Sequence, residues 1–240
     1  MLHLKEVRLL SEQYPTRNHY PFNIDVLQQT RSIQFSSPVT FFIGENGSGK
    51  TTLLEALARR CNIHIWSGIE RTRSVINPYE ETFFLYIEVE WTDGIVIGSF
   101  FSSQIFRNFA QLVDEWEADN PGQIDYFGGK SLIAQSHGQS IMSFFKSRYK
   151  IKGLYLLDEP ETALSPRSQL ELLKLLQETS ALGHAQFIIA THSPILLACF
   201  GSVIYSFDHS PVKTLRYEDT EHYQVYKNFM KNPGKYLKEK

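Results

Sequence analysis

The chain has 240 residues, enough for one large domain or two small ones, and a globular chain of this size buries roughly 70–75% of its unfolded surface. Hydrophobic residues make up 42% and charged residues 21%, which excludes a disordered or collagen-like chain. The net charge of −2 excludes a global basic field that would hold the chain on nucleic acid or on an acidic membrane.

Two cysteines, Cys61 and Cys199, provide neither a disulfide framework nor metal-ligand spacing, which favours a reducing compartment. The first ten residues alternate leucine with charged and polar side chains instead of forming an apolar leader. No run of 18 apolar residues occurs. We therefore expect a cytoplasmic protein without an integral membrane segment.

The first quarter of the chain contains a strand that leads into a glycine-rich turn. Short strands are predicted at residues 2–9 and 22–24, and the apolar run 39–43 stops at Gly44. Apolar residues at helical spacing then follow over residues 53–58. This order predicts a strand, a glycine-rich turn and a helix.

The next segment has the alternation of an antiparallel hairpin. Apolar side chains alternate from residue 83 to 91, Asp93-Gly94 marks a tight turn, and residues 95–97 are apolar again. Residues 105–116 place an apolar stripe on one face of a helix. The segment therefore predicts a β-hairpin followed by a helix.

The second half alternates strands and helices. Helices are predicted at residues 139–150 and 170–176, strands at 154–157 and 186–190, and a weakly amphipathic helix at 222–230. The strand at 154–157 is wholly apolar, as in a parallel sheet covered on both faces.

The predicted fold is a three-layer α/β sandwich in one domain, residues 1–240. Within it we expect a small antiparallel β insertion at about residues 62–103 and a helical region at 104–150.

Eight residues match the pattern G-x-x-x-x-G-K-[ST] between the strand and the helix that this motif requires: Gly44, Glu45, Asn46, Gly47, Ser48, Gly49, Lys50 and Thr51. The glycines let successive backbone N–H groups point at phosphate oxygens, and the start of the helix adds its positive dipole end. Lys50 supplies a charge to the β- and γ-phosphates, and the Thr51 hydroxyl is a hard oxygen ligand for Mg²⁺. The motif predicts nucleotide binding, but kinases and NTPases share it.

Two carboxylates, Asp158 and Glu159, follow the buried strand at 154–157, at the end where open α/β sheets bind ligands. Asp158 would hold Mg²⁺ through a water, and Glu159 would orient or deprotonate the attacking water. The next strand ends at Thr191-His192, where a neutral histidine can donate one ring N–H to a phosphate oxygen. Taken alone, Asp158 and Glu159 also suit a solvated acidic turn. Taken alone, His192 also suits a structural histidine.

These motifs in this order resemble those of an ABC-type ATPase, with His192 lying 33 residues beyond Glu159. That family has a signature motif, usually written LSGGQ, shortly before the Asp-Glu strand. Here Ser136, Gly138 and Gln139 match it, whereas His137 replaces the first glycine and Gln135 the leading leucine. The resemblance implies that Ser136, His137, Gly138 and Gln139 bind the nucleotide of a second chain, although an N-capped helix is the plain alternative.

Two further assignments follow from the resemblance. Gln104 stands where such proteins place a glutamine that senses Mg²⁺ and the attacking water, although it also suits an exposed helix start. Tyr20, 30 residues before Lys50, stands where an aromatic ring stacks on adenine. Tyr14 and Phe22 compete for that role, and each of the three also suits an ordinary core position.

The sequence also resembles small stand-alone bacterial ATPases labelled AAA-family. The tail at residues 217–223 is part of this resemblance. This resemblance implies a soluble ATP hydrolase that uses Mg²⁺, forms a head-to-tail homodimer on ATP, and acts on a protein or nucleic-acid partner that the sequence does not identify. The implied residues are Glu159, His192 and Gln104 for catalysis; Thr51, Asp158 and Gln104 for the metal; and residues 44–51, Thr52 and Tyr20 for ATP.

A nucleotide-binding subunit of an ABC transporter with separate membrane chains is the alternative, and a P-loop kinase ranks below it because it needs no signature motif. Ser136 lies only 86 positions beyond Lys50, which is too short a segment for the long coiled coil of chromosome-maintenance ATPases. A role on DNA therefore cannot be carried over from those proteins.

Overall fold

A six-stranded, mostly parallel sheet forms the centre of the chain, of which the computed structural model describes residues 2–66 and 77–237. Five strands run parallel, and the last one is antiparallel to its neighbour. In spatial order they are β5 (Gly98–Ser102), β6 (Gly153–Asp158), β7 (Ala185–Ala190), β3 (Val39–Ile43), β8 (Val203–Ser206) and β9 (Lys213–Leu215).

The central strands are buried on both faces because each face carries a layer. Alternate side chains of β6 divide between two apolar cores, with Leu154 and Leu156 in one and Tyr155 and Leu157 in the other. Helix α2 (Lys50–Arg60) covers the first face, whereas α4 (His137–Arg148), α5 (Pro166–Ala181) and α6 (Pro194–Leu197) lie on the second. This arrangement confirms the predicted α/β fold.

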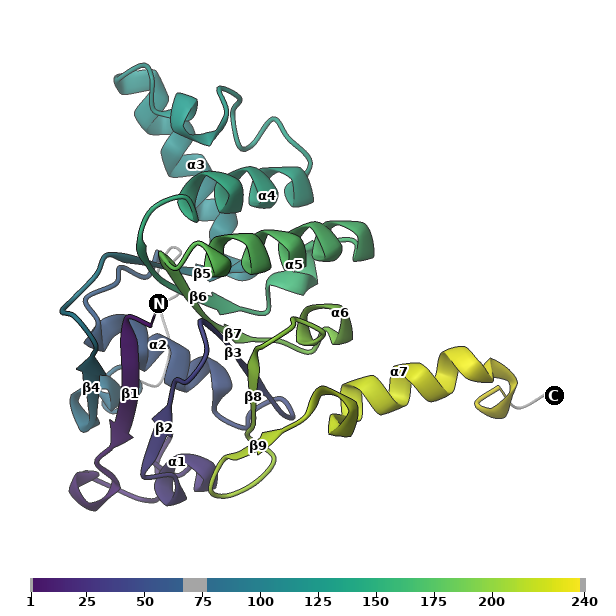
Figure 1. Cartoon of the computed structure of the whole chain (residues 1–240). Helices are drawn as coiled ribbons and strands as arrows, with labels where there is room; N and C mark the ends of the chain where they lie inside the picture. The colour runs from purple at the N-terminus through teal and green to yellow at the C-terminus, as the bar shows by residue number, and fades with distance from the viewer. Residues whose placement is uncertain (1, 67–76, 238–240) are drawn as a thin grey trace.

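A second, antiparallel sheet packs on the outer side of α2 (Figure 1). Its order is β2 (Ser32–Gln34), β1 (Leu4–Leu9) and β4 (Ile87–Trp91). The short helix α1 (Asp25–Gln29) belongs to the apolar core between this sheet and α2. Its buried Leu27 lies in that core with Leu53 and Leu57 of α2. Helix α2 is therefore held between two sheets, which fixes the loop that precedes it.

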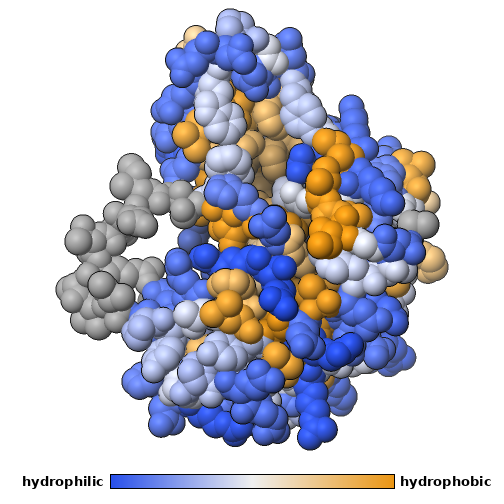
Figure 2. All heavy atoms as spheres, turned by 90° about the vertical axis from the view of Figure 1, so that its left-hand side faces the viewer, coloured by the Kyte–Doolittle hydropathy of each residue, from blue (hydrophilic) through white to orange (hydrophobic). Residues whose placement is uncertain are grey.

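Helices α3 (Ser103–Asp119) and α4 form a lobe at the top of Figure 1. An aromatic cluster joins them, in which Phe109 of α3 packs against Phe144 of α4 with ring centroids 5.2 Å apart. From the side in Figure 2, the surface is hollowed between this lobe and the body below, with apolar residues in the hollow.

The C-terminal helix α7 (Glu221–Lys231) extends away from the body (Figure 1) and has no buried residue. Its first turn is nevertheless fixed, because the cap residue Thr220 is fully buried and its hydroxyl accepts a hydrogen bond from the Tyr223 N–H. Short 3₁₀ segments complete the described chain at Ser11–Gln13, Phe83–Tyr86, Ile124–Phe127, Pro160–Ala163, Tyr217–Asp219 and Pro233–Lys235.

The predicted β-hairpin is wrong. Strand β4 pairs with β1 in the antiparallel sheet, whereas β5 pairs with β6 in the parallel sheet. Ile95 and Ile97, expected in the second hairpin strand, are 77% and 57% exposed and precede β5. The antiparallel sheet is thus built largely from the N-terminal strands rather than from an insertion at 62–103, of which residues 67–76 lie outside the described ranges.

The predicted strand at residues 22–24 is also wrong, because this segment is a turn that leads into α1. Phe22 is fully buried in the core around Tyr14 and Phe83, which explains an apolar residue here without a strand.

Along residues 2–66 and 77–237, none of the helices combines the length and the apolar character that crossing a bilayer requires.

Candidate functional site

The glycine-rich turn between β3 and α2 wraps as a phosphate-binding loop does. Gly44, Gly47 and Gly49 all have positive φ, between 83° and 141°. A Cβ at Gly44 would lie 2.9 Å from Asp208 Oδ1, and one at Gly49 would lie 3.2 Å from the Ile24 side chain. Glycine is therefore required at both positions by conformation and by space, and the loop ends at the N-terminus of α2.

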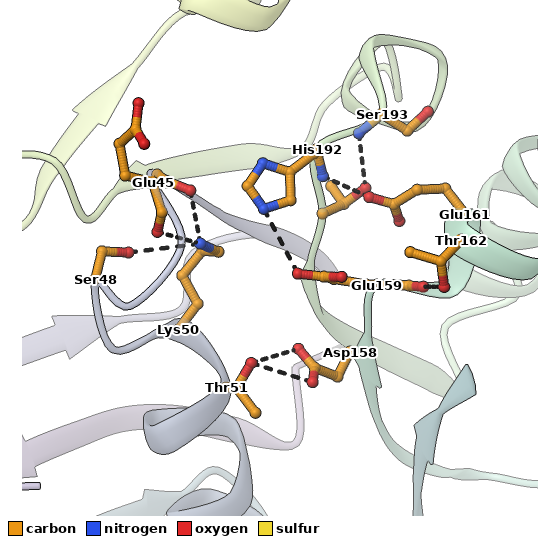
Figure 3. Close-up of polar contacts among 12 residues, drawn as sticks. Glu45, Ser48, Lys50, Thr51, Asp158, Glu159, Glu161, Thr162, His192 and Ser193 are labelled. Carbon is orange, nitrogen blue, oxygen red and sulfur yellow. Dashed lines mark hydrogen bonds and ion pairs between the residues drawn. The ribbon is translucent and has the colours of Figure 1, made fainter. Parts of the chain in front are cut away.

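The Lys50 side chain lies inside this loop and is only 5% exposed (Figure 3). Its Nζ donates to the carbonyl oxygens of Gly44 at 2.6 Å and Glu45 at 2.8 Å. Burial lowers the pKa of Lys50, while the nearby carboxylates, with Glu159 first, oppose that shift. The loop thus holds a desolvated ammonium group whose charge an incoming phosphate would neutralise.

Thr51 and Asp158 face each other across the loop and the end of β6. The Thr51 hydroxyl donates to both Asp158 oxygens, at 3.0 and 3.1 Å. A cavity of about 180 Å³ opens beside them and is also lined by Gln104, Glu55 and Glu159. The structure therefore brings together the three residues that the sequence predicts for the metal.

The donor set of this cavity fits Mg²⁺, which prefers hard oxygen ligands and keeps several waters beside one or two protein oxygens and substrate phosphates. In the described ranges, no group of three or more His, Cys, Asp or Glu side chains is arranged to hold a metal ion by itself. A hydroxyl and one carboxylate would suffice only with phosphate oxygens present. A bound Mg²⁺ would neutralise charge on those oxygens.

The buried, ionised carboxylate of Asp158 destabilises the folded protein when no metal or nucleotide is bound, and this gives a stability prediction. Burial raises the pKa of Asp158 to about 6, with Glu159 adding to the effect. The folded state therefore binds a proton more tightly than the unfolded state, and folding loses stability as pH rises from about 4 to about 6. We expect Asp158→Asn to be more stable than the parent at pH 8 in EDTA, by at most about 3 kcal/mol.

The advantage of Asp158→Asn should shrink as pH falls and nearly vanish at about pH 4, where the folded parent is already protonated. Urea unfolding of both proteins at pH 8, 6 and 4.5 measures this. A parent that is more stable than the variant at pH 8 would contradict the burial argument.

Glu159 occupies a strained backbone position directly after β6. Its φ of 45° lies in the left-handed region, which non-glycine residues rarely adopt and which costs on the order of 1–3 kcal/mol. The strain persists because its N–H donates to the Ala190 carbonyl at 3.0 Å, and its own carbonyl accepts from the Thr162 hydroxyl at 2.9 Å. The turn aims the carboxylate at the space between the loop and His192 (Figure 3).

His192 follows β7 and reaches the same space. Its Nε2 lies 3.6 Å from Glu159 Oε1, and its backbone N–H donates to Glu161 Oε1 at 2.5 Å. Its Nδ1 lies 3.0 Å from Nε2 of His222, from α7. A cavity of about 410 Å³ is lined by Gly44, Asn46, Glu159, His192 and His222, so the histidines face the loop.

Of the three aromatic residues considered for adenine, only one lies on the open side of the loop. Tyr14 and Phe22 pack together in the core, with ring centroids 4.9 Å apart. Tyr20 is 43% exposed, and its hydroxyl lies 3.1 Å from the Thr52 hydroxyl. Tyr20 also lines a cavity with Gly47 and Ser48, where a base attached to loop-bound phosphates would have room.

The signature-like residues are exposed and lie away from the loop of their own chain. Ser136 caps α4, where its backbone N–H and its hydroxyl both donate to Gln139 Oε1, at 3.3 and 2.9 Å. Ser136, His137 and Gln139 are exposed, and His137 lines a cavity between α3 and α4 rather than one beside Lys50. Gly138 packs near the Ala163 carbonyl, which a Cβ would meet at 3.4 Å.

Three residues at the site were not predicted. Asp208, just after β8, accepts a hydrogen bond from the Glu45 N–H at 2.7 Å, Glu161 holds the backbone of His192, and His222 contacts its ring. The position of Asp208 just after an apolar strand could have indicated a residue at the ligand-binding edge of the sheet. The other two depend on contacts across more than 29 residues of sequence, and although His222 lies in the tail 217–223, that pattern does not indicate a contact with His192.

Comparisons with known proteins agree with this geometry. The family profile described as "AAA domain, putative AbiEii toxin, Type IV TA system" matches residues 131–198, and one described as "AAA domain" matches residues 21–59. The second match contains the glycine-rich loop, and the first contains Asp158, Glu159 and His192. The two matches support a resemblance to P-loop ATPases of the ABC/AAA type. No curated protein matches the chain.

Two solved structures illustrate what the chain is similar to. CbiO1 from Clostridium perfringens, described as part of the ABC transporter complex cbiONQ, is 17% identical with a TM-score of 0.51, over 97% of each chain. The SMC head domain from Thermotoga maritima is 16% identical with a TM-score of 0.46, over 90% of this chain and 99% of that one. The likeness to CbiO1 supports the ABC-type fold and nothing finer.

Proposed function

We propose that this protein binds Mg-ATP in the loop 44–51 and hydrolyses it. One observation carries the proposal: residues from the ends of three neighbouring strands meet at one edge of the sheet. Thr51 lies in the first turn of α2 after β3, Asp158 at the end of β6 and His192 after β7. The Thr51 hydroxyl contacts Asp158 at 3.0 and 3.1 Å, and His192 Nε2 lies 3.6 Å from Glu159. A binding loop that only held a nucleotide would not need a strained carboxylate at Glu159.

In this proposal, Lys50 and the loop N–H groups bind the β- and γ-phosphates, and Thr51 and Asp158 would hold Mg²⁺ with Gln104 nearby. Tyr20 would lie against adenine, and Thr52 beside it. The Glu159 carboxylate accepts a proton from water as the water oxygen attacks the γ-phosphorus. The bond from that phosphorus to the bridging oxygen breaks, which gives ADP and phosphate, while His192 donates an N–H to a γ-phosphate oxygen.

The exposed signature residues suit a site completed by a second copy of the chain. Ser136 caps a 12-residue helix that begins with His137, Gly138 and Gln139 and whose N-terminus attracts anions. Within the described ranges, these residues form no hydrogen bond to the phosphate loop of their own chain. In a head-to-tail homodimer, both sites form together because a two-fold interface is isologous. ATP would stabilise such a dimer, and hydrolysis would let it open.

The proposal does not name the partner on which this cycle acts. That partner is a protein, a nucleic acid or the membrane chains of a transporter.

Hydrolysis itself is tested by phosphate release from Mg-ATP. We expect turnover with Mg²⁺ and none in EDTA, and Asp158→Asn should need several-fold more Mg²⁺ for half-maximal rate because it loses the metal-facing charge. A rate independent of Mg²⁺, or an unchanged Mg²⁺ requirement in Asp158→Asn, would contradict the assignment of the metal site.

A further inference from the structure

The tail helix α7 brings a second histidine into the site, and the local structure fixes it there. His222 lies in the first turn of α7, next to the fully buried cap residue Thr220. The turn before the helix is tied to the segment after His192, because the Tyr217 hydroxyl donates to the Pro194 carbonyl at 2.9 Å. Although α7 is exposed from Gln224 onward, His222 and His192 are therefore held as a pair.

The pair has one inner contact and two outer ring nitrogens. His222 Nε2 and His192 Nδ1 are 3.0 Å apart, which requires one hydrogen between them when both rings are neutral. The outer nitrogens, His192 Nε2 and His222 Nδ1, are buried and have no hydrogen-bond partner in the part of the chain that the structure describes. His192 Nε2 lies 3.6 Å from Glu159 Oε1, and His192 lines the cavity together with Gly44 and Asn46.

The surrounding charges select which ring provides the shared hydrogen. If His192 donated from Nδ1, its Nε2 would turn a lone pair towards the Glu159 carboxylate and towards any phosphate in the loop, which is repulsive. If His222 donates from Nε2, His192 Nε2 carries the hydrogen and faces both groups favourably. Burial, and the neighbouring His192 after it, lower the pKa of His222 despite Asp208 and Glu221 nearby, so this ring stays neutral at pH 7.

We propose that His222 is a positioning residue that fixes His192 in its Nε2–H tautomer, so that α7 forms part of the nucleotide site. The role assigned to His192, donation to the γ-phosphate, rests on the proposed function, whereas the tautomer itself does not. Loss of a partner that sets a histidine tautomer, where measured at metal centres, costs about 10- to 100-fold. We expect a loss in that range in kcat, with ATP binding changed less than twofold.

The first test measures the tautomer without nucleotide. ¹⁵N NMR of the histidine side chains should show His192 in the Nε2–H form in the parent, and a substantial population of the Nδ1–H form in His222→Ala. Met230→Ala is the control, because Met230 lies in the same helix, is 75% exposed, and does not line the histidine cavity. An Nδ1–H tautomer in the parent, or the same tautomer ratio in His222→Ala, would overturn the proposal.

The second test is kinetic and uses a conservative rescue. His222→Gln keeps an N–H donor at a similar reach, so it should recover kcat to within about threefold of the parent, whereas His222→Ala stays 10- to 100-fold slower. Met230→Ala should match the parent. If His222→Gln is as slow as His222→Ala, the hydrogen bond is not the reason for the loss, and the proposal is wrong. If the parent does not hydrolyse ATP, the proposed function fails, and the NMR result alone decides the tautomer.

Discussion

Lys50→Ala is expected to weaken ATP binding by roughly 10- to 100-fold, because a charge-assisted contact to phosphate contributes about 1.5–3 kcal/mol. Lys50 is the buried cation at the centre of the loop, and its present partners are carbonyl oxygens at 2.6 and 2.8 Å that a phosphate would replace. Isothermal titration of the parent and the variant with ATP in Mg²⁺ measures the loss.

Lys174→Ala is the matched control, since it removes the same charge from an exposed position on α5. It should bind ATP as the parent does. Equal affinities for the parent and Lys50→Ala would show that phosphate does not bind in the loop 44–51, and the proposed site would be wrong.

Glu159→Gln is expected to slow ATP hydrolysis by roughly 10²–10⁴-fold while ATP binding is kept. Glutamine preserves the shape and the hydrogen-bonded backbone of the strained turn, but it cannot accept a proton from water. Phosphate release under saturating Mg-ATP measures the rate, and ATP titration measures binding.

Glu171→Gln provides the matched control, because Glu171 lies on the surface of α5, where it pairs with Lys146 at 3.5 Å. This variant should hydrolyse ATP at the parent rate. Parent-like turnover in Glu159→Gln would remove Glu159 from the catalytic role, and the carboxyl groups of Asp158 and Glu161 would then need the same test.

The parts of the fold that sequence predicts well are those with strong local signals. The short, mainly apolar runs in β3, β6 and β7 predict buried strands, and their ends carry the loop, Asp158 and His192 to one sheet edge. The site geometry is thus a consequence of parallel strands. This is why Thr51, Asp158 and Glu159 could be grouped before their distances were known.

The hairpin prediction failed because turn chemistry does not determine strand pairing. Asp93-Gly94 does interrupt the chain, but Phe100 and Phe101 are both buried, which indicates a strand covered on two faces rather than a half-exposed hairpin. Gly98 carries a further signal, because a Cβ there would lie 2.5 Å from the Leu154 carbonyl of β6. The alternation over residues 83–91 predicted one strand, whereas its first part, Phe83–Tyr86, is a 3₁₀ turn.

His222 escaped prediction for a different reason. Within its own helix it is one polar residue among several, and the buried cap Thr220 and the anchoring of Tyr217 to Pro194 bring it to His192, 30 residues away in sequence. Sequence patterns find residues that share an element or a strand end. They do not find a contact that depends on how a terminal helix returns to the sheet.

The composite site is tested most directly by mixing two inactive variants, Lys50→Ala and Ser136→Arg. Each homodimer has a defect in both sites, whereas a mixed dimer has one site with an intact loop from one chain and an intact signature helix from the other. Random pairing makes half of the dimers mixed, each with one of two sites intact, so the mixture should recover up to about a quarter of the parent rate of phosphate release. A mixture as inactive as its two components would contradict the head-to-tail dimer and favour a site completed within one chain.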